Sequence, residues 1–336
     1  MILHVGIMAL LFGSGIVMLM MLYASTLGIQ ILIKWDYNSS SPQQLTLERK
    51  TYLISTLTNY AFAFIVLSGL LFVFTADDIH SMFVGAMCAV GSLNANPIGW
   101  NVLWLKIIIF FPAATWLALN YFDQRAEDFP LVKIKYFFLL LITPLIALDL
   151  YLQIQYFLGL HPEYITSCCG ALFSSESSSI AGSLAGMPVK RMMWIFYSCL
   201  FLYCSFCVLC FFTKAAFFRY LVSITAVVFF LVAITSIVSF ISIYIYELPS
   251  HHCPFDILQK NYNYIGYPIY ITLFSGVLFG LFPGVFQVLK KYQSLGKKIS
   301  QAEKKWMIWA VTCTLCFAAI SSWHIIYSNL TMKTYY

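Results

Sequence analysis

The feature that most constrains this chain is a series of long apolar runs along its 336 residues. An α-helix needs about 20 apolar residues to cross the hydrocarbon core of a bilayer. A crossing segment must also satisfy its own backbone hydrogen bonds, which a helix does. We expect membrane-spanning helices at 5–33, 54–76, 101–121, 134–157, 192–213, 220–246, 266–289 and 306–327. The sequence therefore predicts an all-α integral membrane protein, a bundle of about eight transmembrane helices forming one polytopic domain over 1–336.

Composition supports this class and excludes others. Charged residues make up 10% of the chain and hydrophobic residues 61%, whereas soluble domains carry about 25% charged residues. The net charge of +6 is therefore not evidence for nucleic-acid binding, because membrane proteins distribute lysine and arginine unequally across the bilayer. The expected partners are the lipid bilayer and other membrane or periplasmic proteins, with no nucleic acid.

The positions of the basic residues predict the orientation. Fourteen of the 19 lysines and arginines fall in the connections that follow the first, third, fifth and seventh spans. Basic loops remain on the cytoplasmic side. We therefore expect both chain ends on the outer side, in a bacterial inner membrane whose outer side is the periplasm.

This orientation puts all six histidines, and four cysteines that lie in loops, on the outer side. Imidazole and thiolate groups are the usual protein ligands of zinc and copper, and thiols also carry disulfide and redox chemistry. The candidate metal ligands are His251, His252, Cys253, Cys168, Cys169, His80 and Cys88. Copper or zinc is the expected metal. Copper is favoured because Met82 and Met87 lie near Cys88, and thioethers suit Cu(I).

Two of the connections have features of their own. The connection between the second and third spans has an apolar middle, Met82 to Val90, that is too short to cross the bilayer. We expect a re-entrant or interfacial helix there. In the connection at 158–191, Cys168 and Cys169 are adjacent. A disulfide, a strained vicinal pair and a Cu(I) site all remain open for them.

Polar side chains inside the spans are a second candidate site. Lys106 lies in the third span, and Asp149 and Gln153 lie one turn apart in the fourth. Ionisable groups in a bilayer are costly and are functional candidates for that reason. Since both charges fall in the outer half of the membrane, Lys106 and Asp149 are expected to pair, unless Lys106 extends to the interface instead.

The sequence leaves several functions open and does not settle whether the protein is an enzyme. The first hypothesis is transition-metal handling or redox chemistry at the outer face, in support of a periplasmic metalloprotein. The second is a thiol–disulfide oxidoreductase that passes electrons to a quinone. The third is a membrane subunit of an electron-transfer complex that binds haem b or quinone, with His324 as a candidate haem ligand. A structural subunit with disulfide-tied loops is the fourth.

Overall fold

The computed structural model describes residues 2–330 except 38, 40, 127, 162, 164–165, 167–186, 214 and 329. The structure is 83% helical, and its described residues form no strand. Among these residues, eight helices are long and apolar enough to cross a membrane. The predicted all-α bundle of eight spans is therefore confirmed.

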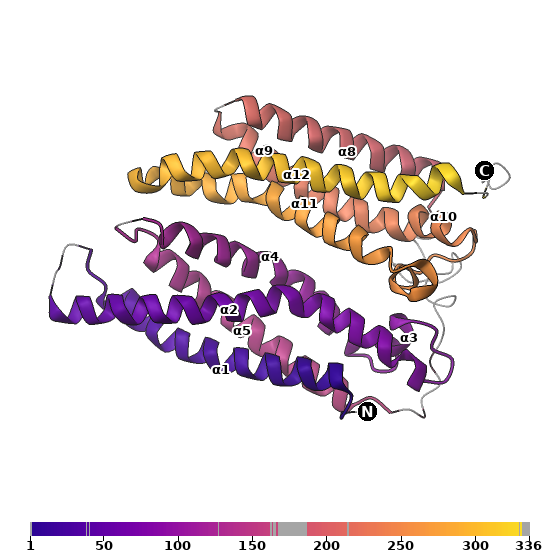
Figure 1. Cartoon of the computed structure of the whole chain (residues 1–336), viewed down its shortest axis with the longest axis horizontal. Coiled ribbons are helices and arrows are strands. Elements are labelled where there is room, and N and C mark those ends of the chain that lie inside the picture. Colours follow the sequence, from indigo (N-terminus) through magenta and orange to yellow (C-terminus); the bar gives the residue numbers. More distant parts are fainter. Residues whose placement is uncertain are drawn as a thin grey trace. The chain divides into compact units, whose positions relative to one another are not determined.

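The chain divides into two compact units, each built from four consecutive spans. The first unit comprises Met1–Val84 and Ser92–Tyr164. Its spans are α1 (Val5–Lys34), α2 (Pro42–Asp78), α4 (Gly99–Asp123) and α5 (Val132–Leu158). Each helix packs against its neighbours in the sequence, and α5 packs back against α1, so the four form a closed ring (Figure 1). Short connections between consecutive helices favour this antiparallel arrangement.

The second unit comprises Gly85–Gly91 and Ile165–Tyr336. Its spans are α8 (Val189–Phe212), α9 (Ala216–Ser236), α11 (Gly266–Gln287) and α12 (Gln293–Tyr327). The α9 helix continues through a π-helical turn, η2 (Ile237–Ile241), into α10 (Ser242–Tyr246). These spans also close a ring, in the order α8, α9, α11, α12. The sequence predicted a single membrane domain. Whether the two units form one domain depends on how they are joined, so this stays a prediction.

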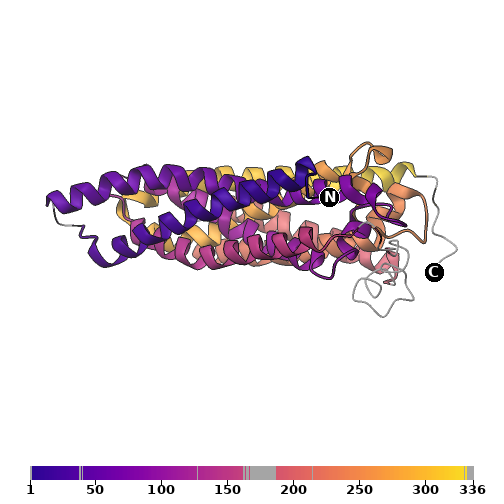
Figure 2. The same cartoon turned by 90° about the horizontal axis from the view of Figure 1, so that it is seen from below.

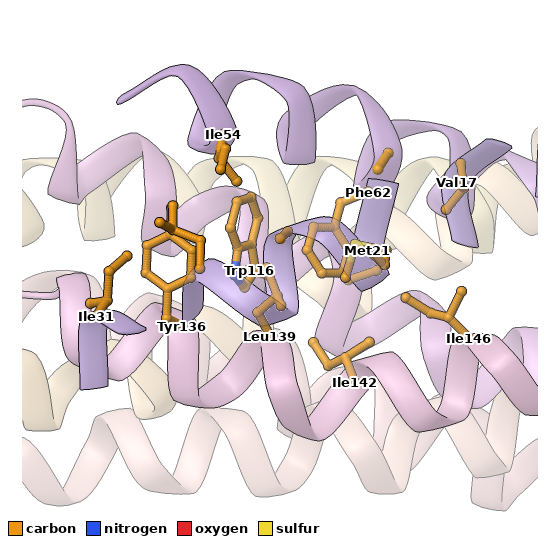
Figure 3. Close-up of a cluster of buried hydrophobic side chains, with 14 of the residues drawn as sticks. Val17, Met21, Ile31, Ile54, Phe62, Trp116, Tyr136, Leu139, Ile142 and Ile146 are labelled. Carbon is orange, nitrogen blue, oxygen red and sulfur yellow. The ribbon is translucent and has the colours of Figure 1, made fainter. Parts of the chain in front are cut away.

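Aromatic and aliphatic side chains fill the centre of the first unit. Phe62 and Trp116 stack with ring centroids 4.5 Å apart, and Met21 and Ile142 pack beside them (Figure 3). A buried tryptophan must also satisfy its indole N–H, and Trp116 Nε1 donates to the Lys135 carbonyl oxygen over 3.0 Å. The centre of this bundle is therefore mainly apolar, and the polar groups buried in it, such as Thr58 and Thr143, bond to backbone carbonyl oxygens of their own helices.

Two spans extend well beyond their apolar runs. The α2 helix starts at Pro42 rather than at 54, because Ser41 caps it by accepting a 3.3 Å hydrogen bond from the Gln44 N–H and proline suits the first helical position. The start of α2 lies at the end of the first unit opposite the start of α1 (Figure 2). The α12 helix likewise starts at Gln293 rather than at 306. Hydropathy detects only the lipid-facing part of a helix, so polar extensions escape it.

The segment between α2 and α4 contains two short helical turns. These are η1 (Ile79–Met82) and α3 (Ala89–Asn94), joined through Gly85, whose φ of +84° favours glycine. The helix predicted at Met82 to Val90 therefore forms further along the chain. Its depth relative to a bilayer stays a prediction.

Two of the fourteen basic residues counted with the cytoplasmic connections, Lys135 and Arg219, are buried within helices. Lys135 is 1% exposed on α5, and Arg219 is 7% exposed on α9. Lys135 pairs with Asp123 and Arg219 pairs with Glu303. Hydropathy alone could not separate a loop lysine from one that reaches a carboxylate on a neighbouring helix.

Candidate metal centre

A loop between α10 and α11 carries three of the seven predicted metal ligands, His251, His252 and Cys253, and tyrosines from both helices hold it. The α10 helix ends where Glu247 adopts a left-handed φ of 55°. The Tyr246 hydroxyl then donates to the Cys253 carbonyl oxygen over 2.5 Å, and the Tyr270 hydroxyl donates to the Pro254 carbonyl oxygen over 2.7 Å. The backbone that presents Cys253 is therefore anchored on both sides.

The second part of the centre is the short segment Gly85–Gly91, which belongs to the same unit. Gln259, just beyond the loop, donates its Nε2–H to the Met87 carbonyl oxygen over 2.7 Å. This bond holds the segment next to the loop, and the following residue is Cys88. Cys88 and Cys253 are separated by 165 residues in the sequence, yet their sulfur atoms lie 3.6 Å apart.

Cys88, Cys253 and Asp256 form a compact group. One ligand atom from each lies within 4.8 Å of the other two, and all three residues are buried. The Cys253 thiol donates to Asp256 Oδ1 over 3.4 Å. The 3₁₀ turn η3 (Asp256–Leu258) begins at Asp256. Two sulfurs and one carboxylate oxygen that converge in this way match the donor atoms of thiolate-rich zinc sites.

His251 contacts the far oxygen of the same carboxylate. Its Nε2 lies 2.5 Å from Asp256 Oδ2, and its ring packs edge-on against Tyr246 with centroids 4.6 Å apart. A histidine in this place orients the carboxylate, as groups behind metal ligands commonly do.

The pKa of Asp256 reflects two opposing effects. Burial alone would raise it, but hydrogen bonds from His251, Cys88 and Cys253, together with the charge of His251, outweigh burial and hold the pKa below its usual value. Asp256 is therefore ionised throughout the neutral range. A lowered folded-state pKa means that its contribution to stability is present above the unfolded pKa and is lost only as the pH falls through the folded value.

His252 lies in a different environment from its neighbour. Its side chain is buried, and Nδ1 lies 3.0 Å from the Val238 carbonyl oxygen in the π-helical turn η2. Burial is the main cause of a lowered pKa for His252, so its ring is neutral at pH 7 and Nδ1–H donates to the carbonyl. Histidine ligands commonly use one ring nitrogen in this way. His252 does not, however, join the group of Cys88, Cys253 and Asp256 in the described part of the chain.

Of the other predicted ligands, only those that the structure describes can be placed, and they lie outside this group. Cys168 and Cys169 lie outside the described residues, so their prediction stays untested. His80 belongs to the first unit, where its Nδ1 contacts the Asp77 carbonyl oxygen. Met82 and Met87 are 42% and 64% exposed. His324 is half-buried on α12 and is not part of the cysteine group among the described residues.

The polar residues inside the first unit form the pair that the sequence predicted. Lys106 Nζ lies 3.0 Å from Asp149 Oδ2, and Lys106 is only 5% exposed, so it does not extend to the interface. Gln153 donates to the same carboxylate oxygen over 2.6 Å, and Ser68 accepts a 3.3 Å bond from Lys106. A functional role for this pair stays a prediction.

The sequence reasoning did not assign a role to Asp256. It treated the loop as a source of imidazole and thiolate and passed over the carboxylate three residues after Cys253. The spacing of three residues could have suggested that a turn brings Asp256 back to Cys253, although the 3₁₀ turn η3 itself begins only at Asp256. The predicted orientation put Cys253 and Cys88 on the same side of the membrane, but no sequence signal singled out these two as a pair.

Comparisons of this chain with protein-family models, with curated proteins and with solved structures find no match. The geometry of the cysteine group is therefore the observation from which a function has to be argued.

Proposed function

We propose that this membrane protein binds one thiophilic transition-metal ion through Cys88, Cys253 and Asp256. The convergence of two buried thiols and a carboxylate within 4.8 Å carries the proposal. Deprotonated, the three groups bring three negative charges together in a buried place, which is unfavourable without a cation. A divalent metal removes most of this repulsion, and His251 or a water molecule would complete a tetrahedral site.

Zinc suits this donor set best. Thiolate sulfur binds both Zn²⁺ and Cu(I), but a carboxylate oxygen is a harder ligand that zinc accepts and Cu(I) does not favour. The sequence favoured copper because of Met82 and Met87, and both side chains are exposed. We therefore propose zinc as the first occupant. Cu(I) would be held by the two sulfurs alone.

The burial of the two cysteines favours a metal ion that stays bound over one that is passed on to another protein. Cys88 and Cys253 are both 0% exposed, so a metal there has no open path to a partner protein. The ion would tie the segment Gly85–Gly91 to the loop before α11. With the predicted orientation, this joint faces the periplasm, where the protein would support a metalloprotein or an electron-transfer partner.

A thiol–disulfide function is the second candidate, and the 3.6 Å separation of the two sulfurs favours it. Oxidation would join Cys88 and Cys253 in a disulfide, releasing two protons and passing two electrons to a quinone. The neighbouring Asp256 carboxylate opposes this chemistry, because reactive thiolates occur in electropositive surroundings. Metal binding is therefore the better-supported function.

Metal analysis of the full-length protein in mild detergent tests the proposal. Protein purified without chelators is expected to contain about one zinc per chain, and cobalt substitution is expected to produce thiolate-to-cobalt charge-transfer absorption. Thiol alkylation before and after reduction, on the same sample, separates the two candidates. Protein that takes up neither metal, but gains two reactive thiols on reduction, would replace the metal site with a disulfide.

Metal affinity is expected to fall as the pH falls. Each thiol must lose a proton to bind, so the apparent affinity should decrease by up to about a hundredfold per pH unit below the thiol pKa values. Asp256 adds nothing to this slope in the neutral range because its lowered pKa keeps it ionised. Competition with a chelator of known pH dependence, between about pH 6 and 8, measures the slope. An affinity independent of pH would contradict thiolate ligation.

A further inference from the structure

A polar cavity of about 350 Å³ lies at the opposite end of the second unit from the cysteine group. The cysteine group follows α10, whereas the cavity lies where α8 ends and α9 begins, so the whole run Ala216–Tyr246 separates them. At 1.5 Å per residue, this run is about 45 Å long. The volume is at the lower end of the range for ligand pockets, roughly 300–1,000 Å³.

Basic side chains outnumber acidic ones around this cavity. Its lining includes Arg219, Lys290 and Lys304, and among the residues that the structure describes there Glu303 is the only carboxylate. Arg219 pairs with one oxygen of Glu303, and Lys290 Nζ lies 2.7 Å from the other. One carboxylate neutralises only one positive charge, so the lining carries two in excess.

Backbone dipoles modify this excess without reversing it. The α9 helix begins here without a capping side chain, and its first turn holds no acidic residue. Its amino end adds about half a positive charge, while the carboxyl ends of α8 and α11 each add about half a negative one. A net excess of about one and a half positive charges remains, which favours an anion.

The wall of the cavity is amphipathic. Phe211 and Phe212, which end α8, are 36% and 77% exposed, and Lys304 Nζ lies 5.9 Å from the Phe211 ring centroid. The exposed phenylalanines and the exposed Lys304 bring the cavity to the surface. Basic groups next to exposed aromatic rings at the end of membrane helices match a phospholipid, with its phosphate in the cavity and its chains along the rings.

We propose that this cavity binds a phosphate-bearing anion, supplied by the headgroup of an anionic phospholipid in the leaflet that faces the basic loops. Arg219 and Lys290 both pair with Glu303 in the wall of the cavity. Lys304 adds positive charge beyond what the Glu303 carboxylate neutralises. In the predicted orientation this is the cytoplasmic leaflet. A bound lipid there stabilises the junction of α8, α9 and α12.

Thermal unfolding of the delipidated full-length protein in non-ionic detergent tests this site. The probes are short-chain phosphatidylglycerol, phosphatidylcholine with the same chains, and sodium phosphate. Phosphatidylglycerol is expected to raise the midpoint of unfolding in a saturable way. In the Lys304→Gln variant its apparent affinity should fall about fivefold. Lys305→Gln, an exposed neighbour outside the lining, should behave like the unchanged protein.

Three results would overturn the proposal. Equal stabilisation by phosphatidylglycerol and phosphatidylcholine would remove the anion preference. An equal effect of Lys304→Gln and Lys305→Gln would show general surface electrostatics rather than this cavity. Full stabilisation by phosphate at concentrations matched to the lipid would make the ligand a soluble phosphate compound. Native mass spectrometry of the same samples counts the lipids bound per chain and does not depend on stability.

Discussion

Replacing Cys253 with serine is expected to weaken metal binding by more than about a hundredfold, because even residues behind a metal's ligands are worth ten- to a hundredfold in affinity. A serine hydroxyl does not ionise in the neutral range, so it supplies neither the charge nor the soft donor atom. Cys88→Ser is expected to have the same effect, although the two residues lie 165 positions apart. The measurement is metal content after dialysis, together with the charge-transfer spectrum of the cobalt form.

Two further variants serve as controls for this result. Asp256→Asn keeps the shape of the side chain but removes its charge, so an intermediate loss of affinity is expected. Cys316→Ser changes an exposed cysteine on α12 and should leave metal content unchanged. If Cys88→Ser and Cys316→Ser lose metal equally, the proposed ligand set is wrong.

Replacing Asp123 with leucine is expected to destabilise the first unit by about 3–5 kcal/mol, the usual cost of leaving one partner of a buried ion pair uncompensated. Lys135 Nζ lies 2.6 Å from Asp123 Oδ2, and the two side chains are 1% and 0% exposed. Asp123 also accepts a 2.9 Å bond from the Leu131 N–H, and Lys135 donates to Asn120 over 3.0 Å. In the leucine variant, the Lys135 ammonium group stays buried without the carboxylate that neutralises it. Unfolding in mild detergent by added denaturing detergent measures the loss.

The double variant Asp123→Leu/Lys135→Met separates charge from packing. Replacing both partners with apolar side chains removes the uncompensated charge, so most of the lost stability should return. Lys50→Leu removes an exposed charge on α2 of the same unit and should cost no more than about 0.5 kcal/mol. A double variant as unstable as the single one would show that hydrogen bonding by Asp123, not the ion pair, holds this end of the bundle.

The ion pairs show where sequence reasoning succeeds and where it stops. Lys106 and Asp149 were expected to pair because both lie within apolar runs, where an unpaired charge is costly. Lys135 and Asp123 form a closely similar pair between the same helices, α4 and α5, yet Lys135, at the edge of the expected fourth span, was counted with the loop residues and no partner was predicted for it. The difference is position, because residues near the ends of apolar runs look like loop residues until the helix ends are known.

The candidate metal centre was likewise predicted only in part. His251, His252 and Cys253 stood out because three such residues in a row are uncommon, and the structure brings His251 and Cys253 to one carboxylate. The neighbouring histidine His252 instead contacts the Val238 carbonyl oxygen. Adjacent side chains point in different directions, so a run of ligand types does not predict which members share a site.

The sequence by itself determined the eight spans, because backbone groups in a bilayer leave an apolar run of this length little alternative to a helix. It also indicated that Lys106 and Asp149, two charges inside apolar runs, would need partners. Only the tertiary structure decided that Cys88 meets Cys253, that Asp256 completes their group, and that Arg219, Lys290 and Lys304 surround one cavity. These contacts join residues far apart in the chain, and they depend on how helices pack around one another, which local hydropathy does not encode.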